Sequence, residues 1–146
     1  MNRLSNVTNN GRGGLFATTL EKEELRRGLA TPDGVFLSLD GSKIETATQF
    51  LMALGEQLRV PDLAEAEDWD YLDECLVDLD EFPVAESFII FFDQFQHLAM
   101  AEPRKWETIL WAFGHAVEAG QKRRKPMYIF LRGKPAPEGL QVIDQT

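Results

Sequence analysis

Residues 67–81 read EDWDYLDECLVDLDE, a stretch that combines a helical apolar rhythm with eight carboxylates and no basic side chain. The apolar residues recur at intervals of three and four positions: Trp69, Leu72, Leu76 and Leu79. Cys75 lies next to these apolar positions, and Pro83 prevents a helix from continuing beyond this stretch. The stretch therefore predicts an amphipathic helix that packs on a core and turns its carboxylates outward.

The carboxylates of this predicted helix are stacked on one another. Asp70, Glu74 and Asp78 are spaced four residues apart, and like charges at this spacing repel by roughly 0.2–0.5 kcal/mol per pair. A helix kept for stability alone would usually intersperse lysines. The pattern leaves two interpretations: a solvated face on which the repulsion is tolerated, or a face shaped for a positively charged partner.

The acidity of the chain is concentrated in one segment. Of the 24 Asp and Glu residues, 13 lie between residues 60 and 103, where there is no Lys or Arg, whereas the remainder has 11 acids against 15 bases. A concentrated negative field disfavours nucleic-acid phosphate and anionic lipid, and it attracts a basic protein at an increased association rate. We therefore expect neither nucleic acid nor membrane as a partner, although a run of charge is equally typical of a solvated face.

The length of 146 residues and the 44% hydrophobic content are those of one globular domain. No apolar run approaches the roughly 18 to 20 residues of a membrane helix, and the N-terminal stretch lacks the apolar core of a secretory signal. The single cysteine, Cys75, agrees with a reducing compartment, so we expect a cytoplasmic monomer. Residues 1–17 and 134–146 are expected to be flexible tails around a domain at 18–133.

Strand-forming runs alternate with helical patterns along the chain. This alternation predicts an α/β fold in which a small three-stranded parallel sheet is flanked by about four helices. The apolar run SFIIFF suits a strand buried on both faces. Predicted strands lie at about 34–39, 87–92 and 127–132. Besides the acidic helix, we expect four helical segments. They are a short helix that starts with a Thr18 and Glu21 capping box, a helix that starts near Thr46 or Thr48 and ends before Pro61, a helical turn from Gln94 to Ala101, and a long helix from Pro103 to Gly120.

Motifs for catalysis or metal binding are missing or incomplete in the sequence. GRGG at residues 11–14 has no strand before it and no Lys-Ser/Thr pair after it, so it is not a phosphate loop. Cys75 lies among carboxylates and beside the apolar positions, which favours a packed thiol over a nucleophile. His97 and His115 fall in no metal-binding spacing, and the DWDYLDE run has Asp73 where a calcium loop requires glycine. We expect no enzymatic activity, no cofactor and no metal.

The order of the predicted parts and two short motifs are characteristic. A strand ending in a tight turn precedes a helix that closes on a proline, then an acidic helix, an apolar strand after a proline, a long helix and a last strand. WDYLDECL at residues 69–76 is similar to a block written N-[WL]-D-A-L-x-D-C-L, and the EFP at 81–83 fits the strand start that follows it. Over about residues 33–133 the chain thus resembles the barstar family of ribonuclease inhibitors.

This resemblance implies that the protein inhibits a basic, extracellular-type ribonuclease, as an inhibitor or immunity protein. In the family, the second helix and the loop before it enter the active site and present carboxylates where RNA phosphate would bind. Asp70 matches the first helix aspartate of the family, Glu74 replaces the second, and Glu81 matches a third acidic contact. The residues expected to bind the partner are Asp68, Asp70, Asp73, Glu74 and Glu81.

The chain also departs from the family pattern. The loop before the acidic helix, DLAEAE at residues 62–67, has no aromatic residue, and His115 stands near the position of an acidic residue of the last long helix. A second interpretation is therefore an acidic adaptor that uses the same fold to bind another basic protein. A third, a small metal-dependent enzyme, has neither a histidine nor a glycine loop to join its carboxylates.

Overall fold

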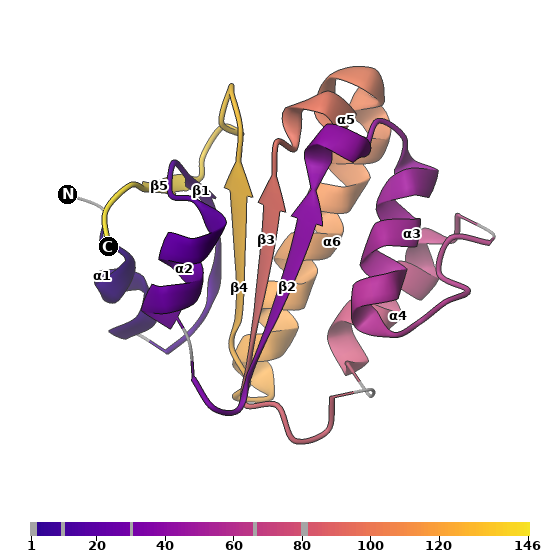
Figure 1. Ribbon diagram of the computed structural model, residues 1–146. Helices are drawn as coiled ribbons and strands as arrows, with labels where there is room; N and C mark the ends of the chain where they lie inside the picture. Colours follow the sequence, from indigo (N-terminus) through magenta and orange to yellow (C-terminus); the bar gives the residue numbers. More distant parts are fainter. Residues whose placement is uncertain (1–2, 10, 30, 66, 80–81) are drawn as a thin grey trace.

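The apolar run SFIIFFD forms an inner strand of a parallel sheet, as predicted. This strand, β3 (Ser87–Asp93), pairs in parallel with β2 (Gly34–Asp40) on one edge and with β4 (Met127–Arg132) on the other. Its residues 88–92 are buried because both faces of the strand are covered. The structure is a computed structural model that describes residues 3–9, 11–29, 31–65, 67–79 and 82–146 (Figure 1).

Two further strands extend the sheet beyond β4. β1 (Gly14–Thr18) pairs in parallel with β4, and β5 (Gln141–Ile143) pairs in parallel with β1, which gives the order β2-β3-β4-β1-β5. The α/β class and the parallel sheet are confirmed, but the predicted number of three strands is wrong. Both additional strands come from the segments that were expected to be tails.

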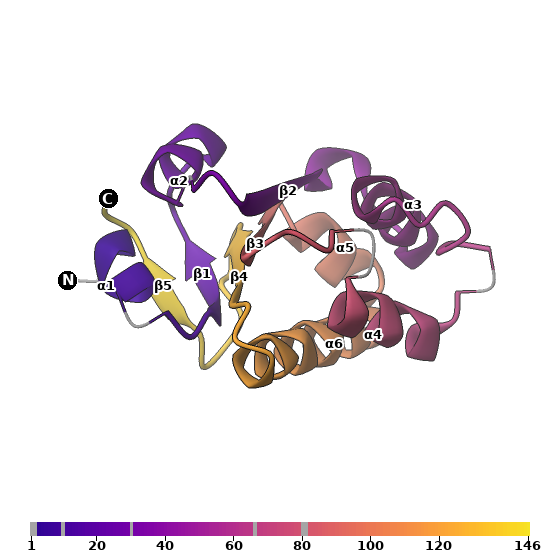
Figure 2. The same ribbon diagram turned by 90° about the horizontal axis from the view of Figure 1, so that it is seen from below.

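Four helices cover one face of the sheet (Figure 2). They are α3 (Ala47–Leu58), α4 (Trp69–Asp78), α5 (Gln96–Ala101) and α6 (Pro103–Lys122), and a short 3-10 helix, η1 (Gly41–Lys43), follows β2. Their apolar sides bury a large core against alternate residues of β2, β3 and β4: Leu37, Leu39, Phe88, Ile90, Phe92, Met127, Ile129 and Leu131.

A second, smaller core lies on the opposite face of the sheet. It is covered by α1 (Leu4–Asn9) and α2 (Lys22–Leu29), which bring in buried leucines. A Cβ at Gly28 would lie 2.5 Å from Leu4 Cδ2, so the missing side chain of this glycine lets α1 approach α2. The strands contribute the intervening residues of the sheet, so this core includes Phe16, Ile89, Phe91, Tyr128, Phe130 and Ile143.

The two longest helices begin where the sequence predicts. The Thr46 hydroxyl accepts a hydrogen bond from the Gln49 N–H at 3.1 Å, and the Gln49 side chain accepts one from the Thr46 N–H at 3.2 Å, which completes a capping box for α3. α6 begins at Pro103, but it does not stop at Gly120, because it continues to Lys122. A Cβ at Gly120 would lie 2.8 Å from the Lys125 carbonyl oxygen, so this glycine permits a close backbone approach instead of ending the helix.

Thr18 does not cap a helix, contrary to the predicted capping box with Glu21. It ends β1, where its buried hydroxyl donates to the Ile143 carbonyl at 2.6 Å and accepts from the Leu20 N–H at 3.0 Å. The helix α2 starts later, at Lys22, and Glu24 accepts the Glu21 N–H at its start. Within the described parts of the chain, none of the helices is both long enough and apolar enough to cross a membrane.

Replacing Leu4 by alanine tests whether the segment before β1 is part of the second core. Leu4 is 1% exposed, so Leu4→Ala should lower the free energy of unfolding by about 2 kcal/mol or more. The neighbouring exposed Ser5 provides a matched control, and Ser5→Ala should change this free energy by less than about 0.5 kcal/mol. Chemical denaturation of the three proteins measures the difference, and equal stability of both variants would contradict the packing of α1.

Candidate functional site

The acidic helix α4 begins with a carboxylate that belongs to the helix itself. Asp68 has an extended backbone, with φ −92°, and its Oδ1 accepts hydrogen bonds from the N–H groups of Asp70 at 3.0 Å and Tyr71 at 3.2 Å. These bonds satisfy two donors that have no partner inside the helix, and the negative charge lies at the positive end of the helix dipole. Asp68 is therefore an N-cap.

The end of α4 is set by a backbone turn and not by Pro83. Leu79 adopts a left-handed conformation, with φ 49°, and its N–H donates to the Cys75 carbonyl. The helix therefore ends at Asp78, several residues before the proline. The Leu79 side chain is 6% exposed and joins the core, which keeps this conformation in place for a residue other than glycine.

α4 is fixed along its length by the neighbouring helix α6 (Figure 2). Leu72 and Leu76 point into the core with no exposed surface. Contacts from α6 and its C-cap residue follow α4 in the same order as the residue numbers, so the two helices run parallel. They are Lys105 Nζ to Glu67 Oε2 at 3.0 Å, His115 Nδ1 to Asp73 Oδ1 at 2.5 Å, and Arg123 Nη1 to the Val77 carbonyl at 2.5 Å.

The loop before α4 is tied to the starts of two other helices. Lys105 Nζ lies 3.0 Å from Glu67 and 3.2 Å from Glu102, and its hydrogen bonds to Glu67 and then Glu102 raise the pKa of its ammonium group. Glu102 accepts the Ala47 N–H at 2.8 Å, and this bond is the main cause of a lowered pKa for its carboxyl group. The bonds connect the loop, α6 and α3, so the N-terminal end of α4 has a defined position.

The outer side of α4 carries the carboxylates that the sequence stacks at four-residue spacing. The side chains of Asp70, Glu74 and Asp78 are exposed. Within the residues that the structure describes, Asp70 and Glu74 form no ion pair and their carboxylates accept no hydrogen bond. We call these three residues the acidic ridge. Among the described residues, no basic side chain pairs with Asp70 or Glu74, so the charge of both carboxylates is displayed to solvent.

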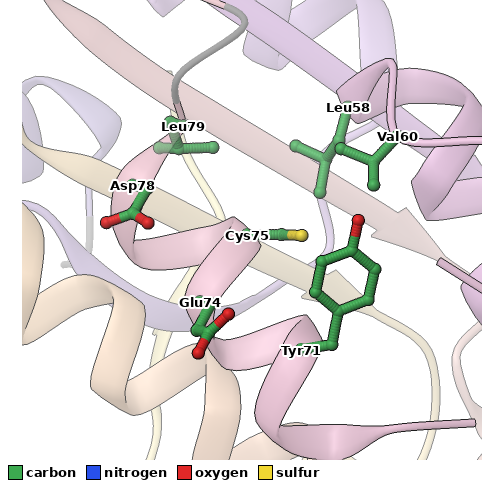
Figure 3. Close-up of a pocket in the computed structure, with 7 residues that line it drawn as sticks. All are labelled: Leu58, Val60, Tyr71, Glu74, Cys75, Asp78 and Leu79. Atoms are coloured by element: carbon green, nitrogen blue, oxygen red, sulfur yellow. The ribbon is translucent and has the colours of Figure 1, made fainter. Parts of the chain in front are cut away.

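A hollow of about 200 Å³ lies between the acidic ridge and the end of α3 (Figure 3). Tyr71 and Cys75 point toward Leu58 and Val60, while Glu74 and Asp78 form the outer rim. The Tyr71 hydroxyl donates to Asp62 Oδ1 at 2.9 Å, and this bond is the main cause that raises the pKa of Tyr71 to about 12. Burial raises the pKa of the Cys75 thiol, so the hollow has an uncharged floor and an acidic rim.

The carboxylates predicted to bind a partner have different environments. Asp70 and Glu74 are exposed on the ridge, and Asp68 is exposed but occupied as the helix cap. Asp73 turns toward α6 and is engaged by His115, so it is not presented on the ridge. Glu81 lies outside the residues that the structure describes. The structure thus brings Asp70 and Glu74 together as the free pair.

Sequence reasoning missed the residues of α6 and of the loop that position the acidic helix. Asp73 and His115 are 42 residues apart and Lys105 and Glu67 are 38 apart, so no local pattern connects them. The Tyr71 bond to Asp62 spans nine residues, from the loop to the first turn of α4. A basic residue at the start of the long helix is the one signal that could have suggested a contact with the acidic loop.

The site offers charge and shape instead of reactive groups. Among the described residues, no three His, Cys, Asp or Glu side chains are grouped so that they could hold a metal ion. Burial and the neighbouring carboxylates raise the pKa of the Cys75 thiol and outweigh the hydrogen bond with Tyr71, which lowers it, so formation of a thiolate is disfavoured. The arrangement can therefore bind cations that reach the ridge from outside.

The fold is a parallel α/β sheet with an acidic helix, α4, displayed in the layer on one side of it. The family model described as Barstar (barnase inhibitor) matches residues 35–132, which is about two thirds of the 146 residues. The chain belongs to the barstar family. The matched range begins in β2 and ends with β4, so β1 and β5 lie outside it. No curated protein matches the chain.

Two neighbouring aspartates should respond differently to truncation. Asp68→Ala removes the N-cap and should lower the free energy of unfolding by about 1 kcal/mol. Asp70→Ala is the matched control, and it should leave the melting temperature unchanged or slightly raised because it relieves repulsion with Glu74. Thermal and chemical denaturation measure both effects. A larger loss for Asp70→Ala than for Asp68→Ala would show that the roles are assigned the wrong way round.

Proposed function

We propose that the protein is a non-enzymatic inhibitor, of the immunity or antitoxin type, that binds a basic ribonuclease with its acidic ridge. The observation that carries the proposal is the exposed pair Asp70 and Glu74 on a helix whose other sides are already held. Membership of a family described as barnase inhibitors supports the ribonuclease as the partner. A monomer in the cytoplasm agrees with the single half-buried Cys75.

The proposed mechanism is occupation of a phosphate-binding site by carboxylates. A ribonuclease holds RNA phosphate with cationic side chains, and carboxylates at the same place accept similar charge-assisted hydrogen bonds. Asp70 and Glu74 repel each other in the free protein, and this repulsion is replaced by attraction when guanidinium or ammonium groups arrive. Asp68, Asp73 and Glu81 also remain proposed contacts. Asp68 would bind while it caps α4, and Asp73 would have to share its carboxylate with His115.

The position of the ridge also suits rapid association. The ridge belongs to the segment between residues 60 and 103, which has 13 acids and no Lys or Arg. Such a field steers a basic protein toward α4 before close contacts form. The fixed ends of α4 keep the carboxylates in one geometry, so little conformational freedom is lost when the partner binds.

Affinity capture with two baits tests the proposed function. The wild-type protein and an Asp70→Ala/Glu74→Ala double variant should be immobilised and exposed to lysate and culture medium of the source organism. We expect the wild type to retain a basic ribonuclease and the double variant to lose it, with an affinity lower by about 30-fold or more, since truncating one side of a buried charge pair costs about 2 kcal/mol or more. Purified barnase serves as a second probe, with inhibition as the readout.

A control variant distinguishes binding by the acidic ridge from a general effect of the negative charge of the protein. Glu56 is exposed on α3 and does not line the hollow beside the ridge, so Glu56→Ala should bind the ribonuclease as the wild type does. Equal retention by wild type and double variant would remove α4 as the site. If the wild type retains a different basic protein, the proposed ribonuclease is wrong and that protein is the partner of the acidic ridge.

Association should also depend on salt. Raising the salt concentration from about 50 mM to about 500 mM shortens the screening length, so the association rate constant should fall by about tenfold or more while the dissociation rate changes less. Stopped-flow or surface-based kinetics with the captured ribonuclease measure both constants. An association rate that does not change with salt would rule out steering by the acidic segment.

A further inference from the structure

A large aromatic side chain lies exposed on the helix beside the acidic ridge. Trp111 of α6 is 61% exposed, although an indole of this size usually buries most of its surface. It follows Glu107 by one helical turn and precedes Glu118 by two, and both of these carboxylates are exposed. Between residues 106 and 121, α6 has no Lys or Arg. The indole is therefore an apolar face within acidic surroundings.

The indole is held in place instead of moving freely. Its ring stacks on the His115 ring, with 5.4 Å between the ring centroids and 27° between the ring planes. His115 in turn contacts Asp73 of α4 through its Nδ1. This chain of contacts connects Trp111 to α4, the helix that carries the acidic ridge, and much of the indole remains exposed. An aromatic ring with a fixed orientation loses little conformational freedom when it binds a ligand.

The surface next to the indole is open. Gly114 lies one turn after Trp111, and a Cβ built there would meet nothing within 4 Å. A glycine inside a helix usually costs about 1 kcal/mol relative to alanine, and no close approach within the chain explains it here. The missing side chain leaves free access to the indole along the helix, in the direction of Glu118.

We propose that Trp111 receives an arginine side chain of the basic partner, so that the interface extends from α4 onto α6. A guanidinium group is planar and stacks on an indole face, while its N–H groups remain free to reach Glu107 or Glu118. An ammonium group is more strongly hydrated and has no flat face, so arginine is preferred over lysine. The inference rests on the proposed function in one respect, namely that the partner is a basic protein.

Two peptides of equal charge separate stacking from attraction alone. Nona-arginine and nona-lysine should be titrated into the ¹⁵N-labelled protein while the three indole N–H resonances are followed. We expect the arginine peptide to bind about fivefold more tightly or better, with the largest shift at the Trp111 indole. Trp111→Ala should abolish this preference. Met52 is 62% exposed on α3, so Met52→Ala is a control of equal exposure and should preserve it.

The outcomes distinguish this inference from the proposed function. Equal affinity of the wild type for both peptides, or an unchanged preference in Trp111→Ala, would overturn the arginine site. Self-association of the wild type that is lost in Trp111→Ala, measured by sedimentation, would assign the indole to a second copy and would also overturn it. If the arginine preference depends on Trp111 but the protein captures no ribonuclease, the arginine site is supported and only the proposed ribonuclease partner is rejected.

Discussion

A parallel strand that is buried on both faces, β3, is the constraint on which the rest of the structure depends. Its backbone is paired on both edges, and its side chains alternate between two cores that lie on opposite sides of the sheet. Both faces must be covered, because aromatic and β-branched residues at 88–92 would otherwise meet water. Helices α3 to α6 cover one face, and α1 and α2 cover the other. The acidic helix is thus one part of a layer that the sheet requires.

This dependence explains how α4 tolerates its charges. The stacked carboxylates cost roughly 0.2–0.5 kcal/mol per pair, whereas burying Leu72 and Leu76 contributes about 1.5–3 kcal/mol each. The Asp68 cap adds about 1 kcal/mol. Packing and capping therefore outweigh the repulsion on the exposed side, so the fold does not dictate which residue types stand on the ridge.

The sequence predicts the inner part of the fold because its signals are local. Long apolar runs mark β2, β3 and β4, and helical spacing marks α3, α4 and α6. β1 and β5 escape prediction because they are five and three residues long, and β1 pairs with a strand more than a hundred residues later. They also lie outside the range that matches the family, so the resemblance could not supply them. Within the site, the pattern identifies Asp70 and Glu74 as exposed, but the engagement of Asp73 depends on how α6 packs.

The basic residues of α6 decide which carboxylates remain for a partner. Lys105, His115 and Arg123 all contact the flank of α4 or the loop before it, and each is occupied there. These contacts therefore fix the helix, and the outer ridge keeps its negative field. One of these contacts also positions an exposed side chain, because the His115 ring that engages Asp73 stacks on the indole of Trp111. Since the fold is set by the cores and these contacts lie at the surface, the charges and aromatic side chains of this surface can change while the fold stays the same.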